Sequence, residues 1–452
     1  MDDLLMDVAR RAGRYLDGLD ARTVAAPSEA VARLAALNSP LPDTGEDAEQ
    51  VLALLDEIAS PATTANAGGR YFGFVTGGSL PATLAANWLA TAWDQNAFSS
   101  VASPAAVALE QIALGWLLDV LGLPAGCGGA FVTGATMANF TGLSAARHAV
   151  LAGVAWDVDA RGLFGAPPIT VLVGAEAHPT LFKALAMLGL GRERVIRVPV
   201  DGQGRMRADA LPALEGPAIV CAQAGNVNTG AFDPLEAVCA WAHEAGAWVH
   251  VDGAFGLWTA AAPQRAHLVA GVEQADSWAT DAHKWLNVPY DSGLAFVREA
   301  EHLRAAMSWG AAYIPEGDRR EPIQYTPESS RRARGVEIWA ALRSLGRTGL
   351  ADLIERTCRH ATRFAEGLRA GGYTILNDVV INQVLVSFGD AGTTRRVVAN
   401  LQRDGTCWCG GTVWQGQTAM RISVSSWATA DEDVERSLAA MLRIAAEANH
   451  GA

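Results

Sequence analysis

The sequence predicts an α/β fold, in which a mostly parallel sheet is flanked by helices and followed by a smaller C-terminal α+β domain. Three observations predict it. Short apolar runs alternate with helical segments between about residues 168 and 300, which is typical of parallel strands joined by crossover helices. A small-residue turn leads into a helical stretch at 133–147. After about residue 325, one long helical stretch and a few strand candidates replace the alternation.

Residues 1–60 are predicted to form a helical segment that is an appendage rather than an independent domain. Apolar residues at helical spacing mark one face of its first helix, namely Leu4, Leu5, Val8, Ala12 and Leu16. The proline-bearing stretches AAPSEA and LNSPLPDTGED interrupt the helical pattern. A further helix is predicted over about 105–122, because the pattern stops at Pro124 and Gly126.

The candidate strands of the sheet are short apolar runs. In chain order they are GGAFV, ITVLVGAEA, RVIRVPV, PAIVCAQAG, AWVHVDGAF, DSWATDAHK and SGLAFVREA, with the helices TLFKALAMLGLG and PLEAVCAWAHEAG among them. The C-terminal part has a long helix from GVEIW, the strand candidates INQVLVSF, GTVWQGQTAM and RISVSSWA, and a final helix, DEDVERSLAAMLRIAAEA. We therefore expect a helical segment over 1–60, a large domain over 61–325 and a small domain over 326–452.

Composition narrows the class of protein. The 452 residues carry a formal net charge of -13 and half of them are hydrophobic. This suits a compact enzyme and argues against nucleic-acid binding, which needs a basic face. Because the N-terminus lacks a secretory signal and no apolar run is long enough to span a bilayer, we expect a cytoplasmic protein. Six scattered cysteines without histidines at ligand spacing predict free thiols and no metal site.

Two motifs near the starts of predicted helices have binding chemistry. In TGATMAN, Ala135 and Thr136 open a helix after Gly134, and free backbone N–H groups at such an end bind phosphate. The plainer interpretation is a packing turn of small residues. In AHPT, His178 has a ring that can stack on a flat ligand, although a lone histidine is more often structural.

Two further motifs follow predicted strands. Asp252 in HVDGAFG ends a strongly apolar run, where a carboxylate needs a cation or hydrogen-bond donors. It is either a buried hydrogen-bonded acid or the partner of a protonated ring nitrogen. Lys284 in TDAHKW is either a surface lysine or a desolvated, nucleophilic amine. A phosphate cup, a stacking ring, a carboxylate and an amine for a Schiff base together predict pyridoxal phosphate (PLP) as the cofactor.

At these residues the sequence resembles the fold-type I PLP enzymes, and most closely the group II amino-acid decarboxylases, such as the aromatic L-amino-acid and glutamate decarboxylases. The resemblance runs from RYFGFVTGGSLPATLA (70–85) to AMRISVSSWAT, and its most specific parts are HVDGAFG and DAHKWLNVPYD. It implies a seven-stranded, mostly parallel sheet in the large domain. It also implies a homodimer with its active sites at the subunit interface.

The resemblance assigns a role to each candidate residue. Lys284 binds the cofactor as an internal aldimine and Asp252 pairs with the pyridine nitrogen, while Ala254 and His178 contact opposite faces of the ring. The remaining candidate cofactor-binding residues are Ala135 and Thr136 for the phosphate, His283, and Asn226, which stands where the family often has threonine.

The acid that protonates Cα is predicted in the segment AMSWGAAYIPEGDRREPIQY, whose glycines, charges and poor periodicity suit a mobile lid. Tyr313 matches the loop tyrosine of these decarboxylases, which comes from the neighbouring subunit, and Tyr325 is the competing candidate. Relatives that yield aldehydes commonly have phenylalanine at that position. The tyrosine therefore favours simple decarboxylation. We expect residues 308–326 and the N-terminal helices to cross the dimer interface.

The substrate is predicted from fewer residues. Phe74, Thr76 and Phe98 match pocket positions of the aromatic decarboxylases, whereas Gly73 stands where those enzymes usually carry an aromatic residue. Arg421 matches an arginine that binds the substrate carboxylate in glutamate decarboxylases, or else forms a structural salt bridge.

We expect decarboxylation of an aromatic or bulky apolar L-amino acid to the amine and CO₂. The alternatives are an acidic amino acid as substrate, or another PLP reaction: decarboxylation coupled to oxidative deamination, transamination or Cα–Cβ cleavage. A further alternative, from another class of protein, is a non-catalytic scaffold.

Overall fold

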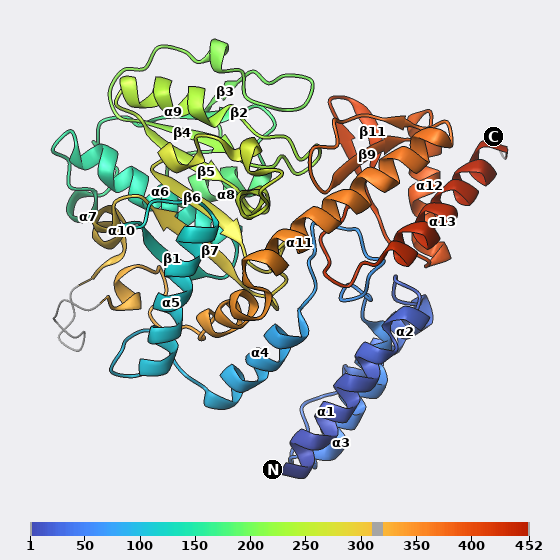
Figure 1. The fold of residues 1–452 in the computed structure, drawn as a ribbon. Coiled ribbons are helices and arrows are strands. Elements are labelled where there is room, and N and C mark those ends of the chain that lie inside the picture. The colour runs from blue at the N-terminus through green and yellow to red at the C-terminus, as the bar shows by residue number, and fades with distance from the viewer. Residues whose placement is uncertain (1, 310–319, 451–452) are drawn as a thin grey trace. The chain divides into compact units, whose positions relative to one another are not determined.

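The computed structural model describes residues 2–309 and 320–450 (Figure 1). They form two compact units. The larger unit comprises Ser79–Arg359 and Asn377–Gln383, and the smaller comprises Met1–Gly78, His360–Leu376 and Val384–Ala452. The segment boundaries predicted from the sequence, after residues 60 and 325, do not coincide with those of the units, and the three-part division stays a prediction.

A seven-stranded sheet forms the centre of the larger unit, as the sequence predicts. Its strands are β1 (Gly128–Val132), β2 (Thr170–Gly174), β3 (Ile196–Val198), β4 (Ala218–Gln223), β5 (Trp248–Asp252), β6 (Ser277–Asp281) and β7 (Gly293–Val297), in the order β1-β7-β6-β5-β4-β2-β3. The pairs β2–β3, β2–β4, β4–β5 and β5–β6 are parallel. Strand β7 is antiparallel to both of its neighbours.

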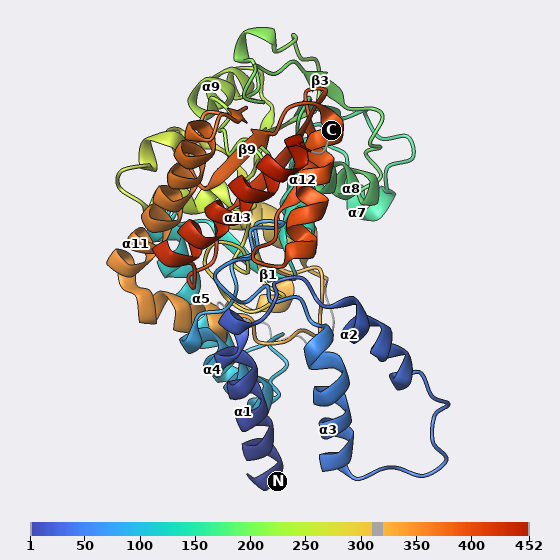
Figure 2. The ribbon, with the colours of Figure 1, turned by 90° about the vertical axis from the view of Figure 1, so that its right-hand side faces the viewer.

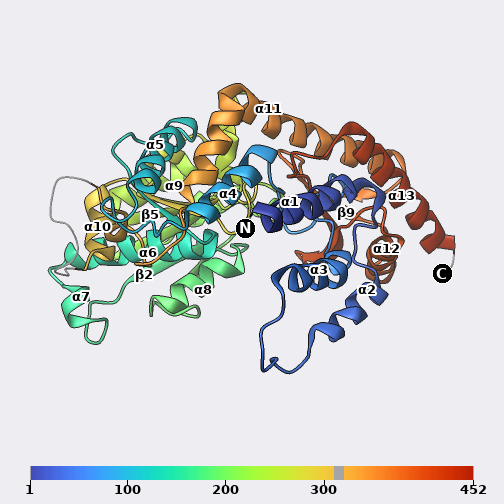
Figure 3. The same ribbon diagram turned by 90° about the horizontal axis from the view of Figure 1, so that it is seen from below.

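Helices cover both faces of this sheet, which explains why β1, β4, β5, β6 and β7 are buried along their whole length. The helices of the unit are α4 (Pro81–Trp93), α5 (Pro104–Val120), α6 (Ala135–Ala152), α7 (Val158–Arg161), α8 (Pro179–Met187), α9 (Leu235–Glu244) and α10 (Ala300–Met307). Figure 3 shows α6, α8 and α10 on one face and α5 and α9 on the other. The first group packs on alternate strand residues such as Val132, Val173 and Ile219.

Helix α11 (Gly335–Ala370) contains residues of both units, because the unit boundary falls between Arg359 and His360. It is the long helix predicted after residue 325, but its helical geometry is interrupted at Gly346, where φ is 60° and ψ is -176°. Glycine tolerates this conformation without the penalty of a Cβ atom.

The smaller unit combines helices with a four-stranded sheet in the order β10-β11-β9-β8. Its strands are β8 (Thr374–Ile375), β9 (Gln383–Ser387), β10 (Gly410–Trp414) and β11 (Gln417–Ser423), and its helices are α1 (Asp2–Asp17), α2 (Ser28–Arg33), α3 (Ala48–Ala59), α12 (Ala391–Asp404) and α13 (Asp431–His450). Helices α12 and α13 lie side by side in Figure 2. An ion pair of 3.1 Å between Arg11 and Asp56 joins α1 to α3.

One strand boundary in this sheet corrects the sequence-based expectation. The run GTVWQGQTAM is not one strand but spans a hairpin: it contains most of β10, the turn and the start of β11. Trp414 pairs with Gln417, and the chain reverses at Gln415 and Gly416. Both turn residues have positive φ, 46° and 82°, as a two-residue hairpin turn of type I′ requires. Strand β11 therefore joins the end of one predicted strand to the start of the next.

The structure also describes the cysteines and the apolarity of the helices. All six cysteines are buried free thiols, as predicted. In the part of the chain at 2–309 and 320–450, none of the helices combines the length and the apolarity that crossing a bilayer requires.

Candidate active site

A cavity of about 310 Å³ lies in the larger unit, at the carboxyl ends of β5 and β6 and the start of α6, the edge of a parallel sheet where ligands bind. Seven residues that the sequence singles out line it: Ala135, Thr136, His178, Asp252, Ala254, His283 and Lys284. They come from four separate stretches of the chain. Thr133, Gly134, Met137, Thr180, Gln223, Gly225, Val227, Phe255 and Asp281 complete the lining.

Lys284 follows β6 and faces a carboxylate that the sequence reading overlooked. Its Nζ lies 3.0 Å from Oδ2 of Asp281, and its side chain is only 20% exposed. Asp281 is itself 2% exposed. Lys284 is therefore not a surface lysine but a largely desolvated amine next to the cavity.

Asp281 also contacts the start of α6. The backbone N–H of Ala135 donates to Oδ1 of Asp281 at 2.5 Å, whereas the N-cap residue, Gly134, has no side chain with which to cap the helix. A Cβ atom at Gly293 of β7 would come within 2.4 Å of the Cα of Gly134. Glycine at 293 thus lets the strand pass directly behind the turn, and the remaining N–H groups of a helix start such as this one can bind an anion.

Asp252 ends β5 and accepts two hydrogen bonds. The backbone N–H of Ala254 donates to Oδ1 at 3.2 Å, and Nδ2 of Asn139 on α6 donates to Oδ2 at 3.2 Å. The side chain is almost wholly buried yet lines the cavity. Such a carboxylate, fixed by donors on the protein side, is suited to receive a cationic N–H from a ligand.

His178 is the N-cap of α8, where Nδ1 accepts the backbone N–H of Thr180 at 3.3 Å. The hydroxyl of Thr180 also lies 2.7 Å from Nδ1. Since Nδ1 is an acceptor, a neutral ring carries its proton on Nε2. These contacts fix the ring at the cavity wall.

His283 is mostly buried next to Lys284. Its Nδ1 accepts the backbone N–H of Ser292 at 3.0 Å, and its Nε2 lies 3.5 Å from Oδ1 of Asp281. Burial lowers the pKa of this imidazole below its ordinary value, and the opposing effect of Asp281 is smaller. The ring of Tyr290 lies against it, with centroids 4.3 Å apart.

Asn226 is adjacent to the cavity rather than in its lining. Its Nδ2 donates to the carbonyl O of Glu176 at 3.2 Å and to Oε1 of Gln223 at 3.1 Å. Its Oδ1 accepts the N–H groups of Asn228 and Thr229. These bonds use the whole amide, so Asn226 is placed to orient Gln223, which lines the cavity beside Asp252.

The structure describes one of the two candidate loop acids, Tyr325. Tyr313 lies outside the described residues. Tyr325 packs against the core on the α6 face of the sheet and has the guanidinium of Arg320 over its ring, 4.7 Å from the centroid. It is not among the described residues that line the cavity.

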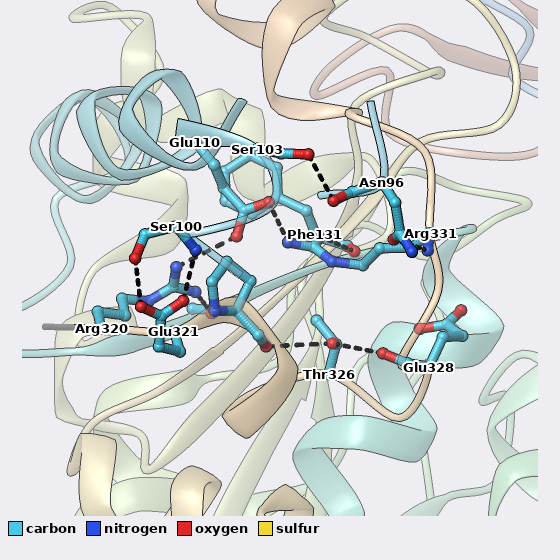
Figure 4. A network of polar contacts seen from close by, with 12 residues as sticks. Asn96, Ser100, Ser103, Glu110, Phe131, Arg320, Glu321, Thr326, Glu328 and Arg331 are labelled. Atoms are coloured by element: carbon cyan, nitrogen blue, oxygen red, sulfur yellow. Dashed lines mark hydrogen bonds and ion pairs between the residues drawn. The ribbon is translucent and has the colours of Figure 1, made fainter. Parts of the chain in front are cut away.

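A buried polar network holds the chain on either side of Tyr325 (Figure 4). Glu110 of α5 pairs with Arg331 at 2.5 Å and with Arg320 at 3.1 Å. The carboxylate of Glu321 accepts the backbone N–H of Ser100 at 2.6 Å and its hydroxyl. Residues 320–325, the last part of the segment that was expected to be a mobile lid, are thus held by contacts within the larger unit.

The residues predicted to contact the substrate do not all belong to the same unit. Phe98, of the larger unit, accepts a bond from Ile323 N–H at its carbonyl and is not one of the described cavity-lining residues. Phe74, Thr76 and Arg421 belong to the smaller unit. Thr76 is buried, whereas Phe74 is 65% exposed and has a φ of 53°.

Gly73 meets an aromatic ring within the smaller unit. A Cβ atom at position 73 would lie 2.2 Å from the ring of Trp408. This indole stacks on Tyr71, with centroids 5.1 Å apart, and lies 5.3 Å from the ring of Phe74. The space that an aromatic side chain at 73 would need is therefore filled by Trp408, which comes from a distant part of the sequence.

Arg421 lies on β11 opposite Gly410. Burial lowers the pKa of its guanidinium. The structural salt bridge that was one interpretation of this residue is not found among the described residues.

Sequence reasoning missed three polar residues: Asp281, Asn139 and Gln223. Asp281 had a local signal, because it precedes Lys284 by three residues at the end of an apolar strand. Asn139 and Gln223 had none, since an amide in an apolar run does not indicate which distant group it bonds.

The donor set fits pyridoxal phosphate. The start of α6 suits the phosphate, Asp252 the pyridine N–H, His178 and Ala254 the ring faces, and Lys284 the aldehyde carbon. Each of these groups lines one cavity.

Comparison with known proteins agrees with this chemistry. Residues 31–389 match the pyridoxal-dependent decarboxylase conserved domain. Tryptophan decarboxylase 1 of Oryza sativa subsp. japonica is 28% identical over 408 residues, covering 81% of this chain and 78% of that relative. The acidic amino acid decarboxylase of Mus musculus is 27% identical over 334 residues, covering 71% of this chain and 60% of the relative.

The fold has a close counterpart among solved structures. The crystal structure of Oryza sativa TDC with PLP and tryptamine has a TM-score of 0.90 at 22% identity, and the match covers 99% of this chain and 97% of that one. The chain belongs to the pyridoxal-dependent decarboxylase family: it is a carboxy-lyase that acts on an amino acid with pyridoxal phosphate as its cofactor.

Proposed function

We propose that this enzyme releases CO₂ from an aromatic or bulky apolar L-amino acid and yields the amine. The observation that carries the choice of site is the position of Lys284, whose largely desolvated amine shares one cavity with Asp252, Ala254, His178 and the start of α6. When bound there, pyridoxal phosphate supplies an electron sink for the bond between Cα and the carboxylate.

Each residue has a task in this proposal. Lys284 would hold the cofactor through its amine, which lines the cavity. Asp252 would keep the ring nitrogen protonated, because its carboxylate is fixed by two donors and has no cation of its own among the described residues. The N–H group and hydroxyl of Thr136 would bind the phosphate at the start of α6, next to Ala135, whose own N–H donates to Asp281. Asp281 holds the lysine amine and the helix start in register.

Borohydride reduction tests the cofactor site directly. Reduction of the holoenzyme, followed by peptide mapping by mass spectrometry, is expected to place a pyridoxyl group on Lys284. The Lys284→Ala variant should lose the visible cofactor absorption. A pyridoxyl group on Lys183, the other lysine of the chain, would contradict the assignment.

The smaller unit supports an apolar substrate. Tyr71, Phe74 and Trp408 form an aromatic cluster there, and Phe74 exposes most of its ring. Non-glycine residues with positive φ, such as Phe74, are strained and cluster at functional sites. Trp408 then supplies the aromatic surface that the position of Gly73 lacks.

Arg421 supports the alternative, an acidic substrate, because its guanidinium is largely desolvated and has no ion pair among the described residues.

A panel of amino acids distinguishes an apolar from an acidic substrate. We expect CO₂ and amine from tryptophan, tyrosine, phenylalanine or leucine, and at least about tenfold lower kcat/KM for glutamate and aspartate. Faster turnover of the acidic substrates would reverse the assignment.

The same panel separates simple decarboxylation from the other PLP reactions. Amine in equal amount to CO₂ supports the proposal. Aldehyde, ammonia and peroxide without amine would indicate decarboxylation coupled to oxidative deamination instead.

We also propose a homodimer in which Tyr313 of one subunit is the Cα acid of the other. Exposed apolar side chains on α3 and α4, among them Leu55, Leu89 and Trp93, support burial against a second copy. A cytoplasmic location stays a prediction from the sequence.

Subunit mixing tests this arrangement. Lys284→Ala and Tyr313→Phe should each be nearly inactive in amine formation. Co-folding the two variants should restore about a quarter of the wild-type rate, because statistical mixing gives half heterodimers with one complete site each. Unrestored activity in a verified heterodimer would mean that Tyr313 does not act across the interface.

A further inference from the structure

Asp252 is the end of a chain of buried polar groups inside the larger unit. Nδ2 of Asn139 donates to its Oδ2 at 3.2 Å, Nε2 of His250 lies 2.9 Å from Oδ1 of Asn139, and Nδ1 of His250 lies 2.8 Å from Oγ of Ser277. Nε1 of Trp248 donates to the same Oγ at 2.8 Å. The chain thus joins β5, β6 and α6.

The fold brings these groups together by register and by one glycine. Trp248, His250 and Asp252 are alternate residues of β5, so their side chains share a face. Ser277 is the residue of β6 directly paired with His250. A Cβ atom at Gly142 of α6 would lie 2.9 Å from Cε1 of His250, and glycine therefore allows the helix to approach the imidazole.

The chemistry of the groups gives the chain one direction. A carboxylate only accepts, so Asn139 must turn its NH₂ group toward Asp252 and its oxygen toward His250. Nε2 of His250 must then carry a proton. Burial keeps this imidazole neutral, because it lowers the pKa of His250 to about 3. Nδ1 consequently accepts, and the hydroxyl of Ser277 donates to it while accepting from Trp248.

We infer that Ser277, His250 and Asn139 are positioning residues, which direct a one-way series of hydrogen bonds at Asp252 and thereby hold its carboxylate for the ring nitrogen of the cofactor. Every donor in the series points toward Asp252. Bonds aligned in this way polarise one another and strengthen the last one. This inference rests on the role proposed for Asp252 and extends it to residues that do not line the cavity.

The test compares binding of pyridoxal phosphate with binding of 1-deazapyridoxal phosphate, in which the ring nitrogen is a C–H group. Dissociation constants are measured by titrating each apoprotein and following tryptophan fluorescence. Wild type should prefer pyridoxal phosphate by at least about tenfold, since only this cofactor makes the charge-assisted bond to Asp252. In Asp252→Asn the preference should disappear.

Three substitutions break the series. His250→Leu, Asn139→Asp and Ser277→Ala should each weaken binding of pyridoxal phosphate by severalfold to tenfold, with little effect on the deaza analogue. His250→Gln, whose amide can donate toward Asn139, should keep most of the wild-type preference. Ser277→Ala is the mildest change and remains informative if the first two variants fold poorly.

Thr141→Val is the matched control, because Thr141 is a buried polar residue of the same helix whose hydroxyl donates within the helix, to the carbonyl of Met137 at 2.7 Å. It should leave both dissociation constants unchanged. Equal weakening of both cofactors in the series variants, or an unchanged preference, would overturn the inference. A wild-type protein without any preference, or Asp252→Asn with the full one, would instead contradict the role of Asp252 itself.

Discussion

Oδ2 of Asp281 lies 3.0 Å from Nζ of Lys284, and Oδ1 of the same carboxylate accepts the N–H of Ala135 at 2.5 Å. One buried side chain therefore ties Lys284 to the first residue of α6, the helix whose start is proposed to bind the phosphate. The protein itself thus fixes the distance between the lysine amine and this helix start, which is a form of preorganisation.

Replacing Asp281 by asparagine is expected to lower kcat by roughly 10- to 100-fold, because an NH₂ group then faces Nζ or the helix N–H and a hydrogen bond to a charged group is lost. The rate is measured at saturating pyridoxal phosphate, with the bound cofactor quantified by absorbance. Asp209→Asn, an exposed carboxylate paired with Arg207, should leave the rate unchanged. A normal kcat in Asp281→Asn would show that the carboxylate serves folding only.

Gly73 and Trp408 are expected to be coupled in stability. Gly73→Ala should lower the free energy of unfolding by about 1–3 kcal/mol, since the new methyl group overlaps the indole. In a Trp408→Ala background the same change should cost much less. Urea unfolding of the four proteins in this double-mutant cycle measures the coupling, and additive effects would contradict the contact.

Trp408→Leu should also change substrate preference if the aromatic cluster contacts the substrate. Loss of one aromatic pairing predicts a decrease of about 2- to 10-fold in kcat/KM for tryptophan relative to leucine. Competition between the two amino acids in one reaction, with both amines quantified, gives this ratio directly. An unchanged ratio would show that Trp408 does not contact the substrate.

The sheet was predictable because its strands are buried on both faces, so their apolar runs are visible without knowledge of the partner strands. Lys284, Asp252 and His178 were found because each stands at the end of such a run or at a helix start. By contrast, the bond between Asn139 and Asp252 joins residues 113 positions apart. The Gly73–Trp408 contact is likewise set by packing between distant segments, which local periodicity does not encode.

His250 predicts a pH dependence of stability. Burial lowers its folded-state pKa from 6.5 to about 3. The imidazole therefore stays neutral in the folded protein, whereas in the unfolded chain it takes up a proton below pH 6.5. The stabilising contribution is fully present above pH 6.5. It is lost progressively as the pH falls toward 3, at up to about 1.4 kcal/mol per pH unit.

Urea unfolding of wild type and His250→Gln between pH 4.5 and 8 isolates this contribution, because the carboxylates titrate in both proteins. Cys221, which pairs with His250 in register, stays neutral in this range, since burial raises the pKa of its thiol. The difference in stability between the two proteins should shrink as the pH falls below 6.5. A constant difference would mean that folding leaves the pKa of His250 unchanged.

Glu110 is expected to be among the most sensitive residues for folding. It is 1% exposed and neutralises two arginines, Arg320 and Arg331. Glu110→Gln leaves buried positive charge unpaired and should cost roughly 3–5 kcal/mol of unfolding free energy. Asp119→Asn is the matched control on the same helix, because Asp119 pairs with Arg347 at the surface and such pairs contribute at most about 1 kcal/mol. If urea unfolding gave both variants the same small loss, the buried network of Figure 4 would not be what holds residues 320–331 in place.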